Sequence, residues 1–317
     1  MFRKLSLFTG MLTALAILQA WCPPASADLL AHWTFDESSG TSVADKTGAY
    51  PGTLSATGSA FVPGGISGNA LFLNRLSNGF ATFGNVFGFT NGNFSVVAWI
   101  KTTPGDTTDN MLIAGKQTAG FNNGYFLNVN TSSAVPLGQL NKAMFYAGEQ
   151  FVTPVSTTTV NDGAWHQVVA VYSAGGNYGI YVDGTPVEAT RPSVPIPANT
   201  ASFLIGGVTF GSTPTGLFTG FIDEVQIYDH ALSDVEIDYL FQNPARELAP
   251  RMAAHPAVEL AWRSKLGVSY QIQWTSEVET NNWSNLGSPI SGNGTTNYFF
   301  DTTRNGTRRF YRIQLAE

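Results

Sequence analysis

Trp165-His-Gln-Val-Val-Ala-Val-Tyr172 and Tyr178-Gly-Ile-Tyr-Val182 are two apolar runs rich in β-branched and aromatic residues, and small and polar residues separate them. Asp183-Gly184 follows the second run and readily supplies the two positive φ angles of a type I′ turn. The chain then continues through Thr185-Pro186-Val187. Pro186 has no N–H to donate, so it belongs at a sheet edge or a bulge. These residues predict antiparallel strands joined by tight turns.

The rest of the first 243 residues repeats this pattern. Phe94-Ser-Val-Val-Ala-Trp-Ile100 is another short apolar run, and turn residues flank it on both sides. Charged residues make up 12% of the chain, against roughly 25% in an average soluble domain. Long surface helices, coiled coils and charge-driven disorder all need more charge than this. The expected fold class is therefore all-β, an antiparallel sandwich.

One helix is expected near the end of this region. Ser233 is placed as its N-cap, and Glu236 completes a capping box. Leu232 and Ile237 are spaced as a hydrophobic staple, and the helix should end near Phe241, before Pro244. Its apolar residues are expected to pack on the sandwich; they are Val235, Ile237, Leu240 and Phe241.

The first 27 residues have the features of a secretory signal. Arg3 and Lys4 precede an apolar stretch, and Ala25-Ser26-Ala27 follows it, which predicts cleavage before Asp28. Cys22 lies inside this segment, so the mature chain would contain no cysteine and no disulfide. An uncleaved membrane anchor is the alternative, although the apolar stretch is short for a span of ~20 residues. We expect a product that is secreted or held at the cell surface, with the periplasm as the alternative, and that does not insert into the membrane after cleavage.

Composition divides the mature chain into two parts. Residues 28–243 carry 6 basic and 16 acidic residues, a net charge of −10, whereas residues 244–317 carry 8 basic and 6 acidic residues. Three prolines between Pro244 and Pro256 interrupt both helix and strand, which places a linker at 244–256. A region as acidic as the first part repels nucleic acid and anionic lipid. Neutral ligands or cations are the partners that its charge favours.

Five segments in the first part resemble one known family. They are Trp33-Thr-Phe-Asp-Glu37, Phe94-Ser-Val-Val-Ala-Trp99, Asp162-Gly-Ala-Trp-His166, Tyr181-Val-Asp-Gly184, and Gly220-Phe-Ile-Asp-Glu-Val-Gln-Ile-Tyr228 leading into Ala231-Leu-Ser233. In this order they resemble the laminin G-like, concanavalin A-type jelly-roll family. The resemblance implies a jelly-roll domain over residues 28–243. This fold carries lectin-like modules, adhesion domains and glycoside hydrolases, so the fold alone does not decide the function.

The tail, residues 257–317, alternates apolar and polar residues around Tyr270, Ile272 and Trp274. Period-2 alternation is typical of a half-buried strand. Together with Trp262, Trp283 and Phe310-Tyr311-Arg312, it resembles a small fibronectin type III-like sandwich found at the C-termini of secreted bacterial proteins.

The resemblance also suggests a structural calcium site. Asp36 lies near the first strand, and Asp223 lies in a late strand that the family's topology places beside it. Calcium takes about 6–8 oxygen ligands, mainly carboxylates and carbonyls. Asp45 is a third candidate ligand, with an ordinary Asx turn as the alternative interpretation.

Sugar recognition usually needs an aromatic side chain beside amide or carboxylate groups. Trp33, Trp99 and Trp165 fall within strands and are expected in the core. Two loop-proximal segments fit better, and their candidate ligand-binding residues are Phe121, Asn122, Asn123, Tyr125, Tyr146 and Gln150. The alternative is that these residues close the end of the sandwich.

No catalytic residues are expected. Asp223 and Glu224 are neighbours, which places them on opposite faces of a strand, and they lack the Glu-x-Asp-x-x-Glu spacing of the family's glycosidases. The four histidines show neither metal-ligand spacing nor a catalytic triad. We therefore expect a non-enzymatic protein that binds a polysaccharide, a surface glycan or a surface protein. A structural or protein-interaction module of the cell envelope is the first alternative, and a glycoside hydrolase is the second.

Overall fold

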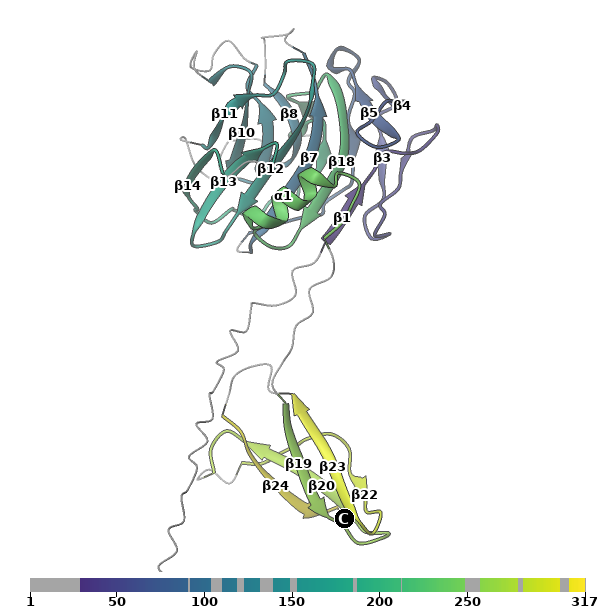
Figure 1. Cartoon of the computed structure of the whole chain (residues 1–317), viewed down its shortest axis with the longest axis vertical. Helices are drawn as coiled ribbons and strands as arrows, with labels where there is room; N and C mark the ends of the chain where they lie inside the picture. The colour runs from purple at the N-terminus through teal and green to yellow at the C-terminus, as the bar shows by residue number, and fades with distance from the viewer. Residues whose placement is uncertain are drawn as a thin grey trace, which may run out of the picture. The chain divides into compact units, whose positions relative to one another are not determined.

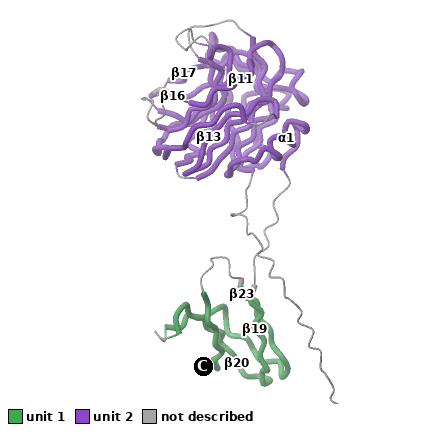
Figure 2. The backbone as a smooth tube through the Cα atoms, turned by 60° about the vertical axis from the view of Figure 1, so that its left-hand side comes forward, with its two compact units in different colours: residues 1–25, 252–317 green, residues 26–251 purple. Residues whose placement is uncertain are grey.

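The computed structural model describes residues 29–90, 92–103, 110–118, 123–131, 139–148, 153–184, 187–211, 213–248, 257–278, 282–302 and 308–316. The chain divides into two compact units, one of residues 26–251 and one whose described part begins at Ala257 (Figure 2). No helix in the described residues is long and apolar enough to cross a membrane. The predicted signal sequence and most of the predicted linker lie outside the described residues.

The first unit is an antiparallel sandwich, as predicted, and each of its two sheets has eight strands in the described residues (Figure 1). The first sheet has the order β14-β13-β12-β7-β18-β5-β4, and β1 pairs with β18. Its strands are β1 (Leu29–Trp33), β4 (Ser59–Pro63), β5 (Asn69–Leu73), β7 (Phe94–Lys101), β12 (Trp165–Tyr172), β13 (Asn177–Val182), β14 (Ala189–Pro192) and β18 (Gly220–Tyr228).

The second sheet has the order β11-β10-β9-β8-β15-β6-β3-β2. Its strands are β2 (Ser42–Val43), β3 (Gly52–Leu54), β6 (Ala81–Thr82), β8 (Met111–Lys116), β9 (Tyr125–Val129), β10 (Lys142–Ala147), β11 (Val155–Thr159) and β15 (Leu204–Ile205). The described part of this unit also contains a separate hairpin, β16 (Val208–Phe210) with β17 (Thr213–Thr215), and a short 3₁₀ helix (Arg75–Ser77).

The core of this unit lies between the two sheets and is rich in aromatic side chains. Trp33 is fully buried, and its ring contacts Phe83 at 4.2 Å and Phe203 at 5.9 Å between centroids. Trp99 is 5% exposed but lies on the outer face of the first sheet, where it stacks on Phe241. Large buried aromatic side chains dominate the energetics of such a core, which explains how the unit can be stable without a disulfide.

Helix α1 (Asp234–Gln242) covers the outer face of the first sheet, across β7, β12 and β18 (Figure 1). The Glu236 carboxylate accepts a hydrogen bond from Ser233 N at 2.8 Å, as the predicted capping box requires. Leu232, Ile237 and Leu240 are buried against this sheet. The prediction for Val235 is wrong: this side chain is 80% exposed.

The second unit contains two smaller antiparallel sheets, as the predicted second β-sandwich requires. One sheet pairs β19 (Ala257–Arg263) with β23 (Thr296–Thr302). In the other, β20 pairs with three strands; the members are β20 (Ser269–Thr275), β21 (Ser284–Asn285), β22 (Ile290–Ser291) and β24 (Phe310–Leu315). Tyr270 and Ile272 of β20 are buried in this unit. The specific likeness to fibronectin type III remains a prediction.

Candidate functional site

The structure brings together the two chain segments in which ligand-binding residues were predicted. The β8–β9 and β10–β11 connections meet where Gly148 N donates a hydrogen bond to Gly124 O at 3.0 Å. Asn123 lies in the first connection, and its side-chain oxygen accepts a bond from Thr118 N at 2.9 Å. Three of the other predicted residues lie outside the described residues; they are Phe121, Asn122 and Gln150.

Tyr125 is a core residue, which corrects its prediction as a ligand-binding one. The side chain is 1% exposed and packs on Phe94, with 4.7 Å between the ring centroids. The hydroxyl donates to Phe87 O at 3.0 Å, and burial raises the pKa of this phenol. Tyr125 lies on the face of β9 that points between the sheets, so its ring offers no surface to a ligand.

Phe126 and Tyr146 lie on the opposite, outer face of the second sheet. Their rings stack with 4.8 Å between centroids and 8° between planes. Leu112 and Val208 are buried with them, and Met144 is partly buried beside them. Phe126, which the sequence analysis missed, thus forms an aromatic pair with the predicted Tyr146. We call these five residues the outer-face cluster.

Three side-chain amides share this face. Asn128 and Asn130 alternate with the buried Leu127 and Val129, and Asn128 Nδ2 donates to Asn130 Oδ1 at 3.0 Å. The Lys116 side chain points toward the core side of the sheet, where its Nζ donates to Asn85 Oδ1. Gln117 directly follows Lys116, so its side chain points to the opposite, outer side.

Each of these amides is buried and keeps an atom without a hydrogen-bond partner in the described part of the chain. The atoms are Gln117 Nε2, Asn128 Oδ1 and Asn130 Nδ2. A buried polar atom without a partner costs about 1–3 kcal/mol. Three such atoms thus lie on the same face of the sheet as one aromatic pair, whose rings are themselves only 7% and 6% exposed.

Asp36 and Asp223 both accept hydrogen bonds from one short turn, residues 64–69, and this link was not visible in the sequence. Asp223 Oδ2 accepts hydrogen bonds from Ile66 N at 2.8 Å and Ser67 N at 3.4 Å. Asp36 Oδ1 accepts from Asn69 N at 2.9 Å. Asp223 is fully buried, and burial together with the negative charge of Glu224 raises its pKa to about 8.

Asp45 does not join these two carboxylates. It is 8% exposed, and its oxygens accept bonds from β1 and from its own turn; the donors are His32 N of β1 and Thr47 N, Thr47 Oγ1, Ala49 N and Tyr50 N of the turn. Burial opposes ionisation, but these hydrogen bonds outweigh it and lower the pKa of Asp45. The bonds from Thr47, Ala49 and Tyr50 are those of an Asx-type turn. In the described residues, no group of three His, Cys, Asp or Glu side chains could hold a metal ion.

A buried histidine links the first and last segments of this unit. His32 Nε2 lies 2.5 Å from Glu224 Oε2, and His32 Nδ1 lies 2.9 Å from Glu247 Oε1. Lys46 Nζ also approaches Glu247, at 3.2 Å. Burial opposes ionisation of Glu247, but its bonds to His32 and Lys46 lower the pKa. No sequence pattern signalled this contact, because Glu247 lies in the predicted linker.

Residues 76–238, more than half of the chain, match the family described as the concanavalin A-like lectin/glucanases superfamily. The chain belongs to this superfamily. No curated protein matches the sequence.

Solved structures share the fold of the concanavalin A-like unit. Domain 4 of an extracellular arabinanase from Geobacillus stearothermophilus, solved with arabinotriose, has a TM-score of 0.52 at 21% identity and covers 68% of this chain and 100% of that chain. The binding domain of Paraclostridial mosquitocidal protein 1 has a TM-score of 0.53 at 11% identity and covers 89% of this chain and 69% of that chain. At these identities, the likeness supports the fold alone.

Proposed function

We propose that this chain is an exported, non-catalytic glycan-binding protein whose concanavalin A-like unit binds sugar at the outer-face cluster. The observation that carries the proposal is the set of three buried amides with unpartnered atoms beside the Phe126–Tyr146 pair. A pyranose offers apolar C–H groups and a ring of hydroxyls. Amides can donate to and accept from hydroxyls, and aromatic side chains pack against the C–H groups.

The environment of the buried acids supports a non-catalytic role. Glycoside hydrolysis generally uses two carboxylates about 5–9 Å apart that flank the scissile bond. Asp223 and Glu224 are 0% and 1% exposed, and they bond to the 64–69 turn and to His32, respectively. Both carboxylates therefore contribute to the structure of the unit.

The proposal includes export and a structural calcium ion. Export rests on the charged start, apolar stretch and Ala25-Ser26-Ala27 ending of the N-terminal segment. The calcium would be held by Asp36 and Asp223, together with backbone carbonyls of the 64–69 turn, because both carboxylates bond to this one turn. Asp45 is left out of this ligand set because it bonds to a different turn, at Ala49 and Tyr50.

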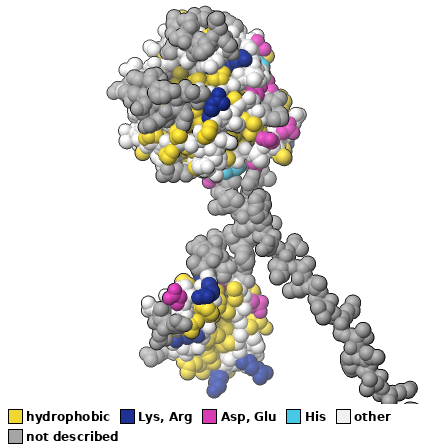
Figure 3. Space-filling model, turned by 90° about the vertical axis from the view of Figure 1, so that its left-hand side faces the viewer, with side chains coloured by type: hydrophobic (Ala, Val, Ile, Leu, Met, Phe, Trp, Pro, Cys, Tyr) yellow, Lys and Arg dark blue, Asp and Glu magenta, His cyan; other side chains and the backbone are white. Residues whose placement is uncertain are grey.

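A protein-interaction role is the second candidate, and exposed apolar side chains in the second unit favour it. Tyr298 and Phe300 on β23 are 59% and 62% exposed. Hydrophobic side chains with Lys and Arg beside them are visible on one face of this unit (Figure 3). Exposed aromatic side chains are enriched at protein interfaces.

The test is binding of residues 28–317 to immobilised polysaccharides and soluble glycans, with calcium and with chelator. Arabino-oligosaccharides belong in the panel because the arabinanase domain was solved with arabinotriose. We expect saturable binding to one sugar class, and Asn128→Ala or Gln117→Ala should weaken it about tenfold. Gln167→Ala is the matched control, because Gln167 is also a buried amide with unpartnered atoms but lies on β12 in the other sheet.

Three results would contradict the proposal. If no glycan binds in either condition, the protein-interaction role gains support. Equal weakening by Gln167→Ala and Asn128→Ala would show that the loss is a general effect of instability. Release of reducing ends from a bound polysaccharide would show that the protein is an enzyme.

A further inference from the structure

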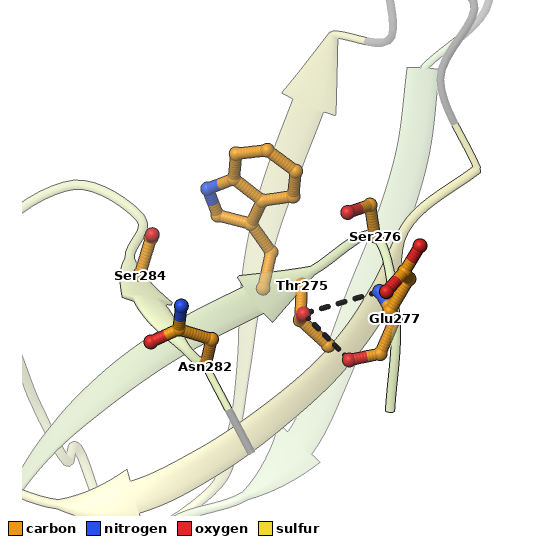
Figure 4. Close-up of a pocket in the computed structure, with 6 residues that line it drawn as sticks. Thr275, Ser276, Glu277, Asn282 and Ser284 are labelled. Atoms are coloured by element: carbon orange, nitrogen blue, oxygen red, sulfur yellow. Dashed lines mark hydrogen bonds between the residues drawn. The ribbon is translucent and has the colours of Figure 1, made fainter. Parts of the chain in front are cut away.

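A cavity of about 450 Å³ lies in the second unit, far along the sequence from the outer-face cluster. It is lined by Trp274, Thr275, Ser276, Glu277, Asn282 and Ser284. Asn282 and Ser284 lie on one side of it, and Ser276 and Glu277 lie on the other (Figure 4). The volume is within the usual range of small-molecule sites, about 300–1,000 Å³.

Contacts behind the cavity fix the orientation of Trp274. The Arg309 guanidinium lies 4.3 Å from the centroid of the indole, and Arg309 donates to Asp301 Oδ2 at 2.7 Å. The Tyr311 hydroxyl donates to the same carboxylate oxygen at 2.7 Å. Trp274 lines the cavity and Arg309 does not. A preorganised ring loses little side-chain entropy when a ligand packs on it.

The polar side chains that line the cavity differ in whether their hydrogen-bonding groups are already used within the protein. The Thr275 hydroxyl is used within its own turn, because it donates to Glu277 O at 2.9 Å and accepts from Glu277 N at 3.2 Å (Figure 4). Ser276, Asn282 and Ser284 are exposed at the cavity and offer two hydroxyls and an amide. The Glu277 side chain also lines the cavity.

We infer that this cavity is a second carbohydrate site, which binds about one or two neutral sugar units. The apolar face of a pyranose packs on Trp274, and its hydroxyls bond to the side chains of Ser276, Glu277, Asn282 and Ser284. A carboxylate among hydroxyls and an amide favours a neutral ligand with many O–H donors over an anionic one. This inference does not depend on the outer-face cluster, because it uses different residues in the other unit.

The test measures binding of neutral di- and trisaccharides of glucose, xylose, arabinose, galactose and mannose to residues 28–317 by calorimetry and saturation-transfer NMR. The variants are Trp274→Ala and the milder Asn282→Ala, whose side chain is exposed. We expect each of them to weaken binding of one saccharide about tenfold or more. Asn128→Ala should leave that binding unchanged, which separates this site from the proposed site of the first unit.

Trp283→Ala is the matched control. Trp283 is half-buried in the same unit and is also stacked by an arginine, since Arg312 lies 4.4 Å from its ring centroid, but it does not line the cavity. Unchanged affinity in Asn282→Ala would overturn the inference, as would an equal loss in Trp283→Ala and Trp274→Ala. Absence of saccharide binding by the Asn128→Ala variant, whose second unit is unchanged, would overturn it as well.

Discussion

Asp223 holds its proton in the folded state over a range in which an ordinary aspartate is ionised. Burial and the adjacent Glu224 charge raise its pKa from 3.8 to about 8. Between these values the unfolded chain releases the proton and the folded chain keeps it, so this residue makes stability fall as pH rises from about 4 to about 8. In Asp223→Asn, thermal melts in chelator should therefore show a smaller fall in Tm over this range. If Tm falls with pH as steeply in Asp223→Asn as in the unmodified chain, the raised pKa does not belong to Asp223.

Asp45→Asn is the contrasting control for that experiment. Hydrogen bonds lower the pKa of Asp45, so its contribution to stability is complete above pH 3.8 and is lost as pH falls through the folded value. An amide oxygen cannot accept all the bonds that this carboxylate accepts. Asp45→Asn should therefore destabilise the protein by about 1–3 kcal/mol at pH 7, and less in acid.

At the residue scale, the sequence showed part of the candidate sugar site. A one-residue step along a strand reverses the face, which is why Tyr125 packs between the sheets and Phe126 is buried in the cluster on the outer face. The alternation was readable, because Asn128 shares the parity of Phe126 and opposes the apolar Leu127. Gln117 gave no such signal, since it follows the end of β8 rather than lying within a strand. The bonds of Asp36 and Asp223 to the 64–69 turn join segments that are distant in the chain, and a single sequence does not reveal such contacts.

The elements that carry local signals were predicted most accurately. The run Trp165–Tyr172 became β12, and Asp183 and Gly184 adopt φ angles of 54° and 66°, as a type I′ turn requires. Val235 was misplaced because its apolar side chain fits a helix pattern, whereas the helix orientation on β7 and β12 leaves it in solvent. The number of strands in each sheet, and the pairing of β1 with β18, come from long-range contacts.

Helix α1 packs against the turn after β13, where Phe241 lies close to Gly184. A Cβ added at Gly184 would lie 2.7 Å from Phe241 Cβ, whereas a Cβ added at Gly175 would have no atom within 4 Å. Both glycines have positive φ, so alanine at either position costs about 1–2 kcal/mol from the backbone. Gly184→Ala should cost a further ~1–3 kcal/mol in urea unfolding because of overpacking.

The double variant Gly184→Ala with Phe241→Ala separates these two costs. Removing the Phe241 ring relieves the overpacking, so the two changes should combine non-additively, with a coupling of about 0.5–3 kcal/mol. Additive costs in the double variant, or equal costs for Gly184→Ala and Gly175→Ala, would show that the helix does not press on this turn.

At the scale of the whole molecule, the two units each contain their own sheets and buried residues. Calorimetry of residues 28–317 should therefore resolve two unfolding transitions, and changes confined to one unit should move only one of them. Trp274→Ala identifies the transition of the second unit, and Gly184→Ala identifies that of the first.

The calcium proposal predicts a selective shift of the first unit's transition. A ligand that binds only the folded state stabilises it by about 2.7 kcal/mol at 100 times Kd, which corresponds to roughly 5–10 °C for a unit of this size. Asp36 is exposed, so Asp36→Asn should change Tm little in chelator but should abolish most of the calcium shift. Because Asp223 must release its proton to bind the ion, the shift should grow as pH rises from 6 to 8. A calcium shift of equal size in Asp36→Asn, or one that moves the second unit's transition, would place the ion elsewhere.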